Sequence, residues 1–102
     1  MTKGKELMKK YPERIPVICI ANPDIHLEKC KFLVDGNATL ASFIIILRKY
    51  MMTQVKSYEA IFLFVNDTLI PNSSTFYTMH SEHKNKRDDI LYIHLKKELT
   101  FG

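Results

Sequence analysis

The 102-residue chain has only two cysteines and three glycines, and it contains no long hydrophobic run. Two thiols outside a Cys-x-x-Cys motif are typical of a reduced protein without a disulfide framework. The longest apolar runs, residues 43–47 and 60–65, are far shorter than the roughly 20 residues that a membrane-spanning helix needs. The charged N-terminus leads to no hydrophobic stretch of the kind that a secretory signal contains. We therefore expect no membrane span, no secretory signal and a cytosolic protein.

The chain also lacks the residue patterns of common catalytic sites. It has no glycine-rich phosphate loop, and no Ser/His/Asp set has an interpretable spacing. His80 and His83 lie three residues apart, but without a third ligand nearby they are more typical of solvated polar residues than of a metal site. We therefore predict no catalytic residue, no metal and no cofactor, so the chain is not an enzyme.

Fifteen basic and eleven acidic residues give a formal net charge of +4, which suits anionic lipid, nucleic acid or acidic peptides. The basic residues gather in two clusters, which are Lys3, Lys5, Lys9, Lys10 and Arg14, and then Lys84, Lys86 and Arg87. A nucleic-acid-binding domain would expose stacking aromatics beside its lysines, whereas most aromatics here fall in predicted core strands. We therefore expect no nucleic-acid partner.

Length and composition, with 46% hydrophobic and 25% charged residues, are those of one globular domain over residues 1–102. Apolar periodicity and turn residues predict eight elements. They are a short helix at 4–10, strands at 15–20 and 29–34, a helix from Thr39, strands at 60–65 and 68–70, a short helix at 75–82 and a last strand at 90–95. The first two strands are expected to form an antiparallel hairpin. A sheet crossed by one long helix, an α+β arrangement, is the simplest packing of this order.

The helix that Thr39 is expected to cap is more apolar than one buried face requires. Its sheet-facing stripe comprises Leu40, Phe43, Ile44 and Leu47. The apolar residues outside that stripe are Ile45, Ile46 and Tyr50. Such a helix is either buried on two sides or leaves hydrophobic surface for a partner.

Lys29 and Lys31 fall on one face of the second predicted strand, which we expect at a sheet edge. Lysines there often serve only to prevent edge-to-edge aggregation. Alternatively, the edge strand accepts an extended peptide by strand addition, and the lysines pair with acidic residues of that peptide. The sequence leaves both interpretations open.

The two cysteines fall in the same predicted hairpin. Pairing Ile15 with Val34 would bring Cys19 opposite Cys30. A catalytic thiolate needs a basic neighbour, whereas Val17 and its neighbours are apolar. We therefore predict ordinary core thiols.

The last residues, Leu99-Thr100-Phe101-Gly102, follow a predicted strand directly. The carboxylate of a terminal glycine has no side chain to hinder threading into a narrow enzyme channel or attack by a nucleophile. Composition alone favours nothing more than a frayed terminus.

Several motifs, in their order and spacing, point to one family. They are Lys9-Lys10-Tyr11-Pro12-Glu13-Arg14-Ile15-Pro16-Val17-Ile18, Lys31-Phe32-Leu33-Val34, Phe64-Val65-Asn66, Leu91-Tyr92 and the terminal Phe101-Gly102. Over nearly the whole chain they closely resemble the GABARAP and light-chain-three family of autophagy ubiquitin-like modifiers. The resemblance implies a ubiquitin-like β-grasp fold with one short N-terminal helix in place of the family's two. It also implies an N-terminal helical segment at 1–13 and a conjugation tail at 97–102.

The resemblance further implies that Gly102, in a tail with Phe101, is carried by activating and conjugating enzymes and joined to phosphatidylethanolamine. A cysteine protease would process and delipidate the protein. The chain would then be a monomer found in the cytoplasm and, lipid-anchored, on the autophagosome membrane. A related modifier that is attached to a protein lysine is the alternative.

Receptors of the family carry a short motif of an aromatic residue, two variable residues and an aliphatic residue, often preceded by acids. The resemblance implies an aromatic pocket formed by Leu7, Pro16, Ile18, Lys31, Leu33 and Ile90. It implies an aliphatic pocket formed by Phe32, Val34, Phe43, Ile46 and Leu47. Basic residues expected to assist are Arg14, Lys29 and Arg48. The chain departs from the family at Lys3, where an acidic residue often lines the aromatic pocket, and at residues 84–87, which replace a commonly acidic stretch.

Overall fold

The computed structural model describes residues 1–23, 25–51 and 59–99. The elements are α1 (Lys3–Lys10), β1 (Arg14–Ala21), β2 (Lys31–Asp35), α2 (Leu40–Met51), β3 (Glu59–Val65), β4 (Thr68–Leu69), α3 (Phe76–His83) and β5 (Leu91–Leu99). This order confirms the one predicted from the sequence. β5 runs past its predicted end at Leu95, because its backbone pairs with β3 as far as Glu59 opposite Leu99. Residues 97–99, predicted as part of the tail, therefore belong to a strand.

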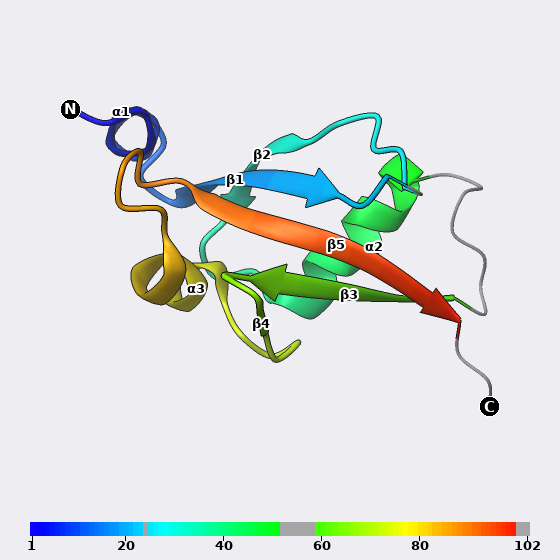
Figure 1. The fold of residues 1–102 in the computed structure, drawn as a ribbon. Coiled ribbons are helices and arrows are strands. Elements are labelled where there is room, and N and C mark those ends of the chain that lie inside the picture. The colour runs from blue at the N-terminus through cyan, green and yellow to red at the C-terminus, as the bar shows by residue number, and fades with distance from the viewer. Residues whose placement is uncertain (24, 52–58, 100–102) are drawn as a thin grey trace.

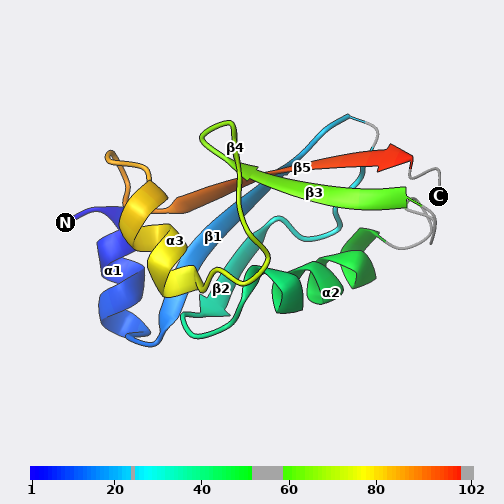
Figure 2. The same ribbon diagram turned by 90° about the horizontal axis from the view of Figure 1, so that it is seen from below.

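The strands form one mixed sheet in the order β2-β1-β5-β3-β4 (Figure 1). β1 pairs antiparallel with β2, in the expected register of Ile15 opposite Val34, and parallel with β5. β2 is therefore an edge strand, as predicted. α2 crosses one face of the sheet, while α1 and α3 lie together at the end where β5 begins (Figure 2). Within the described residues, no helix is long and apolar enough to cross a membrane.

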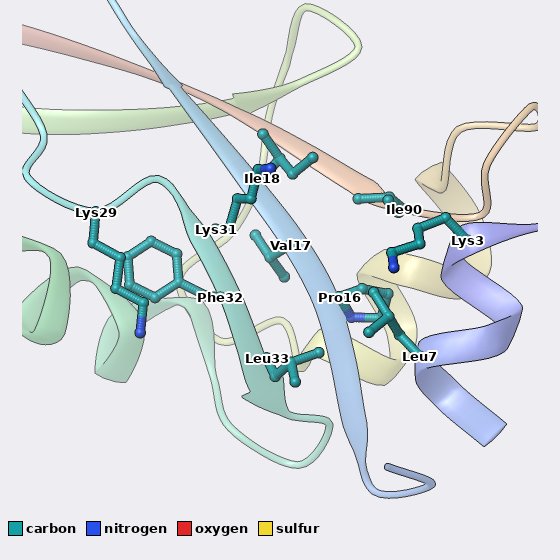
Figure 3. Close-up of a pocket in the computed structure, with 10 residues that line it drawn as sticks. All are labelled: Lys3, Leu7, Pro16, Val17, Ile18, Lys29, Lys31, Phe32, Leu33 and Ile90. Atoms are coloured by element: carbon teal, nitrogen blue, oxygen red, sulfur yellow. The ribbon is translucent and has the colours of Figure 1, made fainter. Parts of the chain in front are cut away.

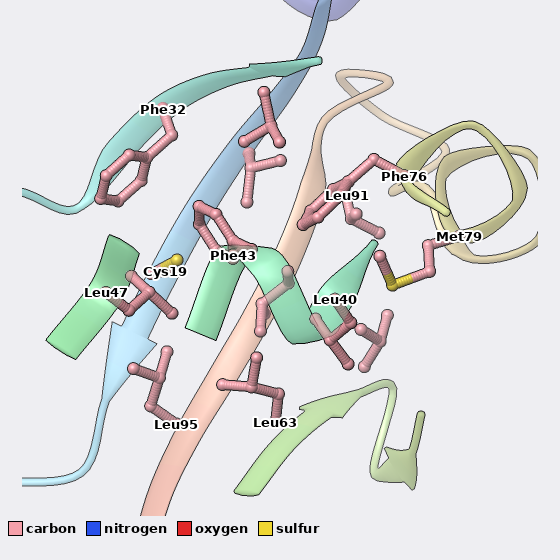
Figure 4. Packing of buried hydrophobic residues seen from close by; sticks show 14 of the residues in the cluster. Cys19, Phe32, Leu40, Phe43, Leu47, Leu63, Phe76, Met79, Leu91 and Leu95 are labelled. Atoms are coloured by element: carbon pink, nitrogen blue, oxygen red, sulfur yellow. The ribbon is translucent and has the colours of Figure 1, made fainter. Parts of the chain in front are cut away.

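α2 begins as expected at Thr39, whose hydroxyl accepts a hydrogen bond from the Ser42 N–H at 3.2 Å. Its buried residues are Leu40, Phe43, Leu47 and Met51. The Phe43 ring makes edge-to-face contacts with Phe32 and Phe76 at centroid distances of 5.2 and 5.1 Å, in the middle of the core (Figure 4).

The apolar residues outside the buried stripe of α2 differ in their exposure. Ile45 is 65% exposed and Ile46 is 43% exposed. Tyr50, in contrast, packs against the core, with its ring 5.6 Å from that of Phe32. The helix is therefore buried on one side and leaves two adjacent isoleucines for solvent or a partner.

Four residues hold α1 against the segment that precedes β5, and we call Thr2, Gly4, Asp88 and Asp89 the α1 latch. The Gly4 N–H donates to the Asp88 carbonyl at 2.7 Å, and the Thr2 hydroxyl donates to the Asp89 carboxylate at 2.5 Å. That hydrogen bond lowers the pKa of Asp89 below its ordinary value. A side chain on Gly4 has no room, since a Cβ there would lie 2.3 Å from the Asp89 carbonyl oxygen. The latch fixes where the residues of α1 stand relative to the sheet.

Candidate functional site

An open groove of about 590 Å³ lies between α1, β1 and the edge strand β2 (Figure 3). Its lining residues are Lys3, Leu7, Pro16, Val17, Ile18, Lys29, Lys31, Phe32, Leu33 and Ile90. The volume lies in the range of ordinary ligand-binding pockets. The lining is mostly apolar, so the groove suits a hydrophobic side chain.

The register of the hairpin explains how the groove is built. Pro16 pairs with Leu33, and Ile18 pairs with Lys31. Alternate residues of a strand point to the same face, so these four side chains share the face that does not contact the core. α1 then adds Leu7 as a side wall.

All six residues that the family resemblance implies for the aromatic pocket line this groove. The structure adds Val17 and places Phe32 here, although the resemblance assigned Phe32 to the other pocket. Lys3 also lines it, at the position where the family resemblance implies an acid. The groove thus brings together residues from four separate parts of the chain.

Every charged side chain that lines the groove is a lysine. Lys3 stands on the α1 side, and Lys29 and Lys31 stand on the β2 side (Figure 3). The ammonium group of Lys29 lies 5.0 Å from the centre of the Phe32 ring and 5.8 Å from that of Tyr50, which are favourable cation–π distances. An apolar floor with a positive rim favours a hydrophobic ligand that carries acidic groups.

Most of the residues implied for the aliphatic pocket are buried in the free protein. Val34, Phe43 and Leu47 are buried in the core, because they form the faces of β2 and α2 that pack together. Of the five residues, Ile46 alone is well exposed. A second pocket at this place stays a prediction, with Ile46 as its accessible member.

The remaining predicted residues lie apart from the groove. Arg14 is exposed at the start of β1, and Arg48 is half-buried near the end of α2. Phe101 and Gly102 lie outside the described residues.

The histidine pair differs from its prediction. His80 is not solvated but buried, and its Nε2 donates to the Asp89 carbonyl at 2.7 Å. His83 lies 3.7 Å from the Glu82 carboxylate. Within the described part of the chain, no group of three or more His, Cys, Asp or Glu residues is arranged to hold a metal ion.

The cysteines lie opposite each other as expected, with the Cys19 N–H donating to the Cys30 carbonyl at 2.8 Å. Both thiols are free, but only Cys19 is buried. The prediction of two core thiols is therefore wrong for Cys30, which precedes the edge strand and is exposed. Burial, and then the nearby Cys30, raise the pKa of Cys19 to about 12.

We expect alkylation of the native protein to modify Cys30 and to spare Cys19. Cys30 is free and exposed, so the reagent reaches its thiol. Cys19 stays protonated until the pH approaches its raised pKa, and its burial also blocks the reagent. Mass spectrometry after iodoacetamide treatment should find one label in the native chain and two after unfolding. Labelling of native Cys30→Ser at the rate of the parent protein would contradict this assignment.

A mixed five-stranded sheet with parallel central strands β1 and β5, crossed on one face by a helix, defines a ubiquitin-like β-grasp protein. The family model described as "Autophagy protein Atg8 ubiquitin like" matches residues 1–102. The chain belongs to the Atg8 family. The expectations of a β-grasp fold and of an autophagy ubiquitin-like family are thereby confirmed.

Individual relatives agree with the family assignment. The chain is 37% identical over 105 residues to Autophagy-related protein 8 of Kluyveromyces lactis, covering 98% of this chain and 81% of that protein. It is 36% identical over 104 residues to the Schizosaccharomyces pombe protein of the same name, covering 99% and 84%.

Two solved structures are similar to the whole fold. The crystal structure of Trypanosoma brucei ATG8 has a TM-score of 0.82 and 34% identity, covering 97% of this chain and 85% of that chain. Plasmodium falciparum Atg8 in complex with a Plasmodium falciparum Atg3 peptide has a TM-score of 0.77 and 25% identity, covering 96% and 87%.

Proposed function

We propose that the chain is an autophagy modifier of the GABARAP and light-chain-three type, joined through Gly102 to phosphatidylethanolamine and able to hold short receptor peptides in the groove. The observation that carries the proposal is the lysine-rimmed apolar groove beside an edge strand, on a fold of the Atg8 family. The protein is a substrate and an adaptor, not a catalyst. It works as a monomer in the cytoplasm and on the autophagosome membrane.

The groove suits an extended peptide that adds to β2 as a further strand. Among the described strands, β2 has no neighbour on its outer side, so its backbone groups there are available for pairing. The peptide's aromatic side chain enters between Leu7, Pro16 and Leu33, and its aliphatic side chain contacts Ile46 on α2. Acidic residues of the peptide pair with the rim lysines. The Plasmodium relative bound to an Atg3 peptide supports a peptide ligand for this fold.

Conjugation uses the tail that follows β5. Activating and conjugating enzymes carry the Gly102 carboxylate until the lipid amine attacks it, and a cysteine protease processes and releases the protein. The motif match that ends in Phe101-Gly102 supports this step. A small terminal residue also leaves the carboxylate accessible to attack.

Leu33→Ala is expected to weaken peptide binding about tenfold or more while the domain stays folded. Leu33 lines the groove and is 39% exposed in the free protein, so its side chain becomes fully buried only under a peptide. Burying a leucine side chain contributes about 1.5–3 kcal/mol. The measurement is calorimetric titration with a synthetic peptide that carries two acidic residues before an aromatic-x-x-aliphatic motif.

Leu69→Ala is the matched control, because Leu69 is 55% exposed and lies on β4, at the opposite edge of the sheet. It should bind the peptide like the parent chain. Equal affinities for the parent and Leu33→Ala would show that the peptide binds elsewhere.

A further inference from the structure

The two basic clusters of the sequence meet at one end of the folded molecule. α1 exposes Lys5, Lys9 and Lys10, and the segment between α3 and β5 exposes Lys84, Lys86 and Arg87. Figures 1 and 2 both place α1 beside that segment. The α1 latch joins the two directly through the 2.7 Å hydrogen bond from Gly4 to Asp88. We call residues 1–10 and 84–90 together the basic end.

Asp89 gives independent evidence that the clusters converge. The hydrogen bond from Thr2 has the largest effect and lowers the pKa of this carboxyl, while burial raises it. The charges of Lys5 and Lys84 lower the pKa further. One carboxylate therefore interacts with lysines from both clusters, although about 80 residues separate Lys5 from Lys84 in the sequence.

The positive charge of the basic end is largely uncompensated. It holds seven basic and three acidic residues, so its net charge equals the +4 of the whole chain. The carboxylate of Asp88 accepts hydrogen bonds from the Ile90 N–H and the Tyr92 hydroxyl, and that of Asp89 accepts from Thr2. Within the described residues, none of the seven basic side chains of the basic end forms an ion pair with a carboxylate. The lysines and the arginine are exposed, and only the longer-range effect of Lys5 and Lys84 on Asp89 links them to a described carboxylate.

The basic end also lies away from the C-terminal end of β5. β5 begins there at Leu91 and runs along the sheet to Leu99 at the opposite end (Figure 1). The molecule is 45 Å long. A partner at the basic end therefore leaves the start of the tail accessible.

We propose that the basic end binds the anionic headgroups of a phospholipid bilayer. Six of its seven basic residues are lysines. A lysine carries a compact point charge, which suits electrostatic attraction to a charged surface, whereas the planar guanidinium of arginine suits bidentate hydrogen bonding to a single phosphate or carboxylate. A single-stranded nucleic acid would typically stack its bases on exposed aromatic side chains. The exposed aromatic nearest in sequence to α1 is Tyr11, and the Lys10 ammonium lies over its ring at 5.5 Å. The choice of a membrane as the negatively charged partner rests on the proposed function. The positive charge of the basic end is a property of the structure and does not depend on that function.

The test is flotation of the unconjugated full chain with vesicles of phosphatidylcholine, with or without phosphatidylserine. The parent chain should float only with the anionic vesicles, and added salt should weaken the binding. Lys84→Gln/Lys86→Gln should bind about 30-fold more weakly, since each lysine near an anionic surface contributes about fivefold to the affinity. Lys49→Gln/Lys96→Gln is the matched control, because both of its lysines are exposed and lie outside the basic end. It makes the same change in net charge and should bind within about threefold of the parent.

Equal losses in the two double variants would overturn the inference, because net charge and not the basic end would then govern binding. Binding to single-stranded RNA that exceeds binding to anionic vesicles at the same salt would also overturn it. Since no conjugation occurs in this experiment, its failure leaves the role of Gly102 untouched. A failed conjugation assay, conversely, leaves vesicle binding by the free chain intact.

Discussion

Gly4→Ala should cost the protein both stability and peptide affinity. A Cβ at this position would lie 2.3 Å from the Asp89 carbonyl oxygen and 2.4 Å from that of Asp88. These are backbone atoms that cannot rotate away, so α1 has to move and the 2.7 Å hydrogen bond from Gly4 is lost. We expect a loss of about 3 kcal/mol in the free energy of unfolding. Peptide affinity should fall about tenfold or more, because the groove loses the wall that Leu7 provides.

Urea denaturation and peptide titration of the same sample measure the two effects. Gly36→Ala is the control, because its Cβ would meet the ring of Tyr77 at 2.3 Å. Tyr77 is 40% exposed and can rotate into solvent, so we expect a loss below about 1 kcal/mol and no change in affinity. A Gly4→Ala protein with parental stability and affinity would mean that the α1 latch does not position the groove.

Phe43→Ala is expected to remove a large part of the stability of the domain. The ring is 1% exposed and makes edge-to-face contacts with both Phe32 and Phe76. Replacing such a buried phenylalanine costs about 3–5 kcal/mol, while a whole domain has only about 5–15 kcal/mol. Thermal unfolding followed by circular dichroism should show a large drop in the midpoint.

Ile46→Ala is the contrasting variant on the same helix. Ile46 is 43% exposed, so its loss should change stability by less than about 1 kcal/mol and should weaken a peptide that carries an aliphatic residue. If Phe43→Ala instead kept its stability and lost only peptide affinity, Phe43 would be a pocket residue, as the family resemblance implies.

The local pattern of apolar and turn residues predicted the helices and strands of this fold well. The order of the strands in the sheet depends on pairing between distant segments. The hairpin has the register of Ile15 opposite Val34, which is the pairing that we considered from the sequence for placing the two cysteines opposite each other. The parallel pairing of β1 with β5 could not be predicted in this way, since the two strands are about 70 residues apart. Pairing with β3 likewise explains why β5 reaches Leu99, within the residues that the family resemblance implies as the conjugation tail.

The groove was predictable only through the family resemblance, and the latch behind it was not predictable at all. In the sequence, Gly4 is merely a poor helix residue, and Asp88 and Asp89 are polar residues of a loop. Their contact depends on the tertiary packing of the two ends of the chain. The aliphatic pocket shows a different limit of sequence-based prediction. An apolar helical stripe that contains Phe43 and Leu47 can form either core or binding surface, and only the position of the sheet shows which of the two it forms.

The most direct test of the proposed function is conjugation in a reconstituted system of activating enzyme, conjugating enzyme and phosphatidylethanolamine liposomes. Mass spectrometry should find the parent chain linked to the lipid through an amide at Gly102, and a chain without Gly102 should form no adduct. If the parent chain forms no lipid adduct, joins only to a protein lysine, or forms the same adduct when Gly102 is removed, then the chain is not the lipid-linked modifier that we propose.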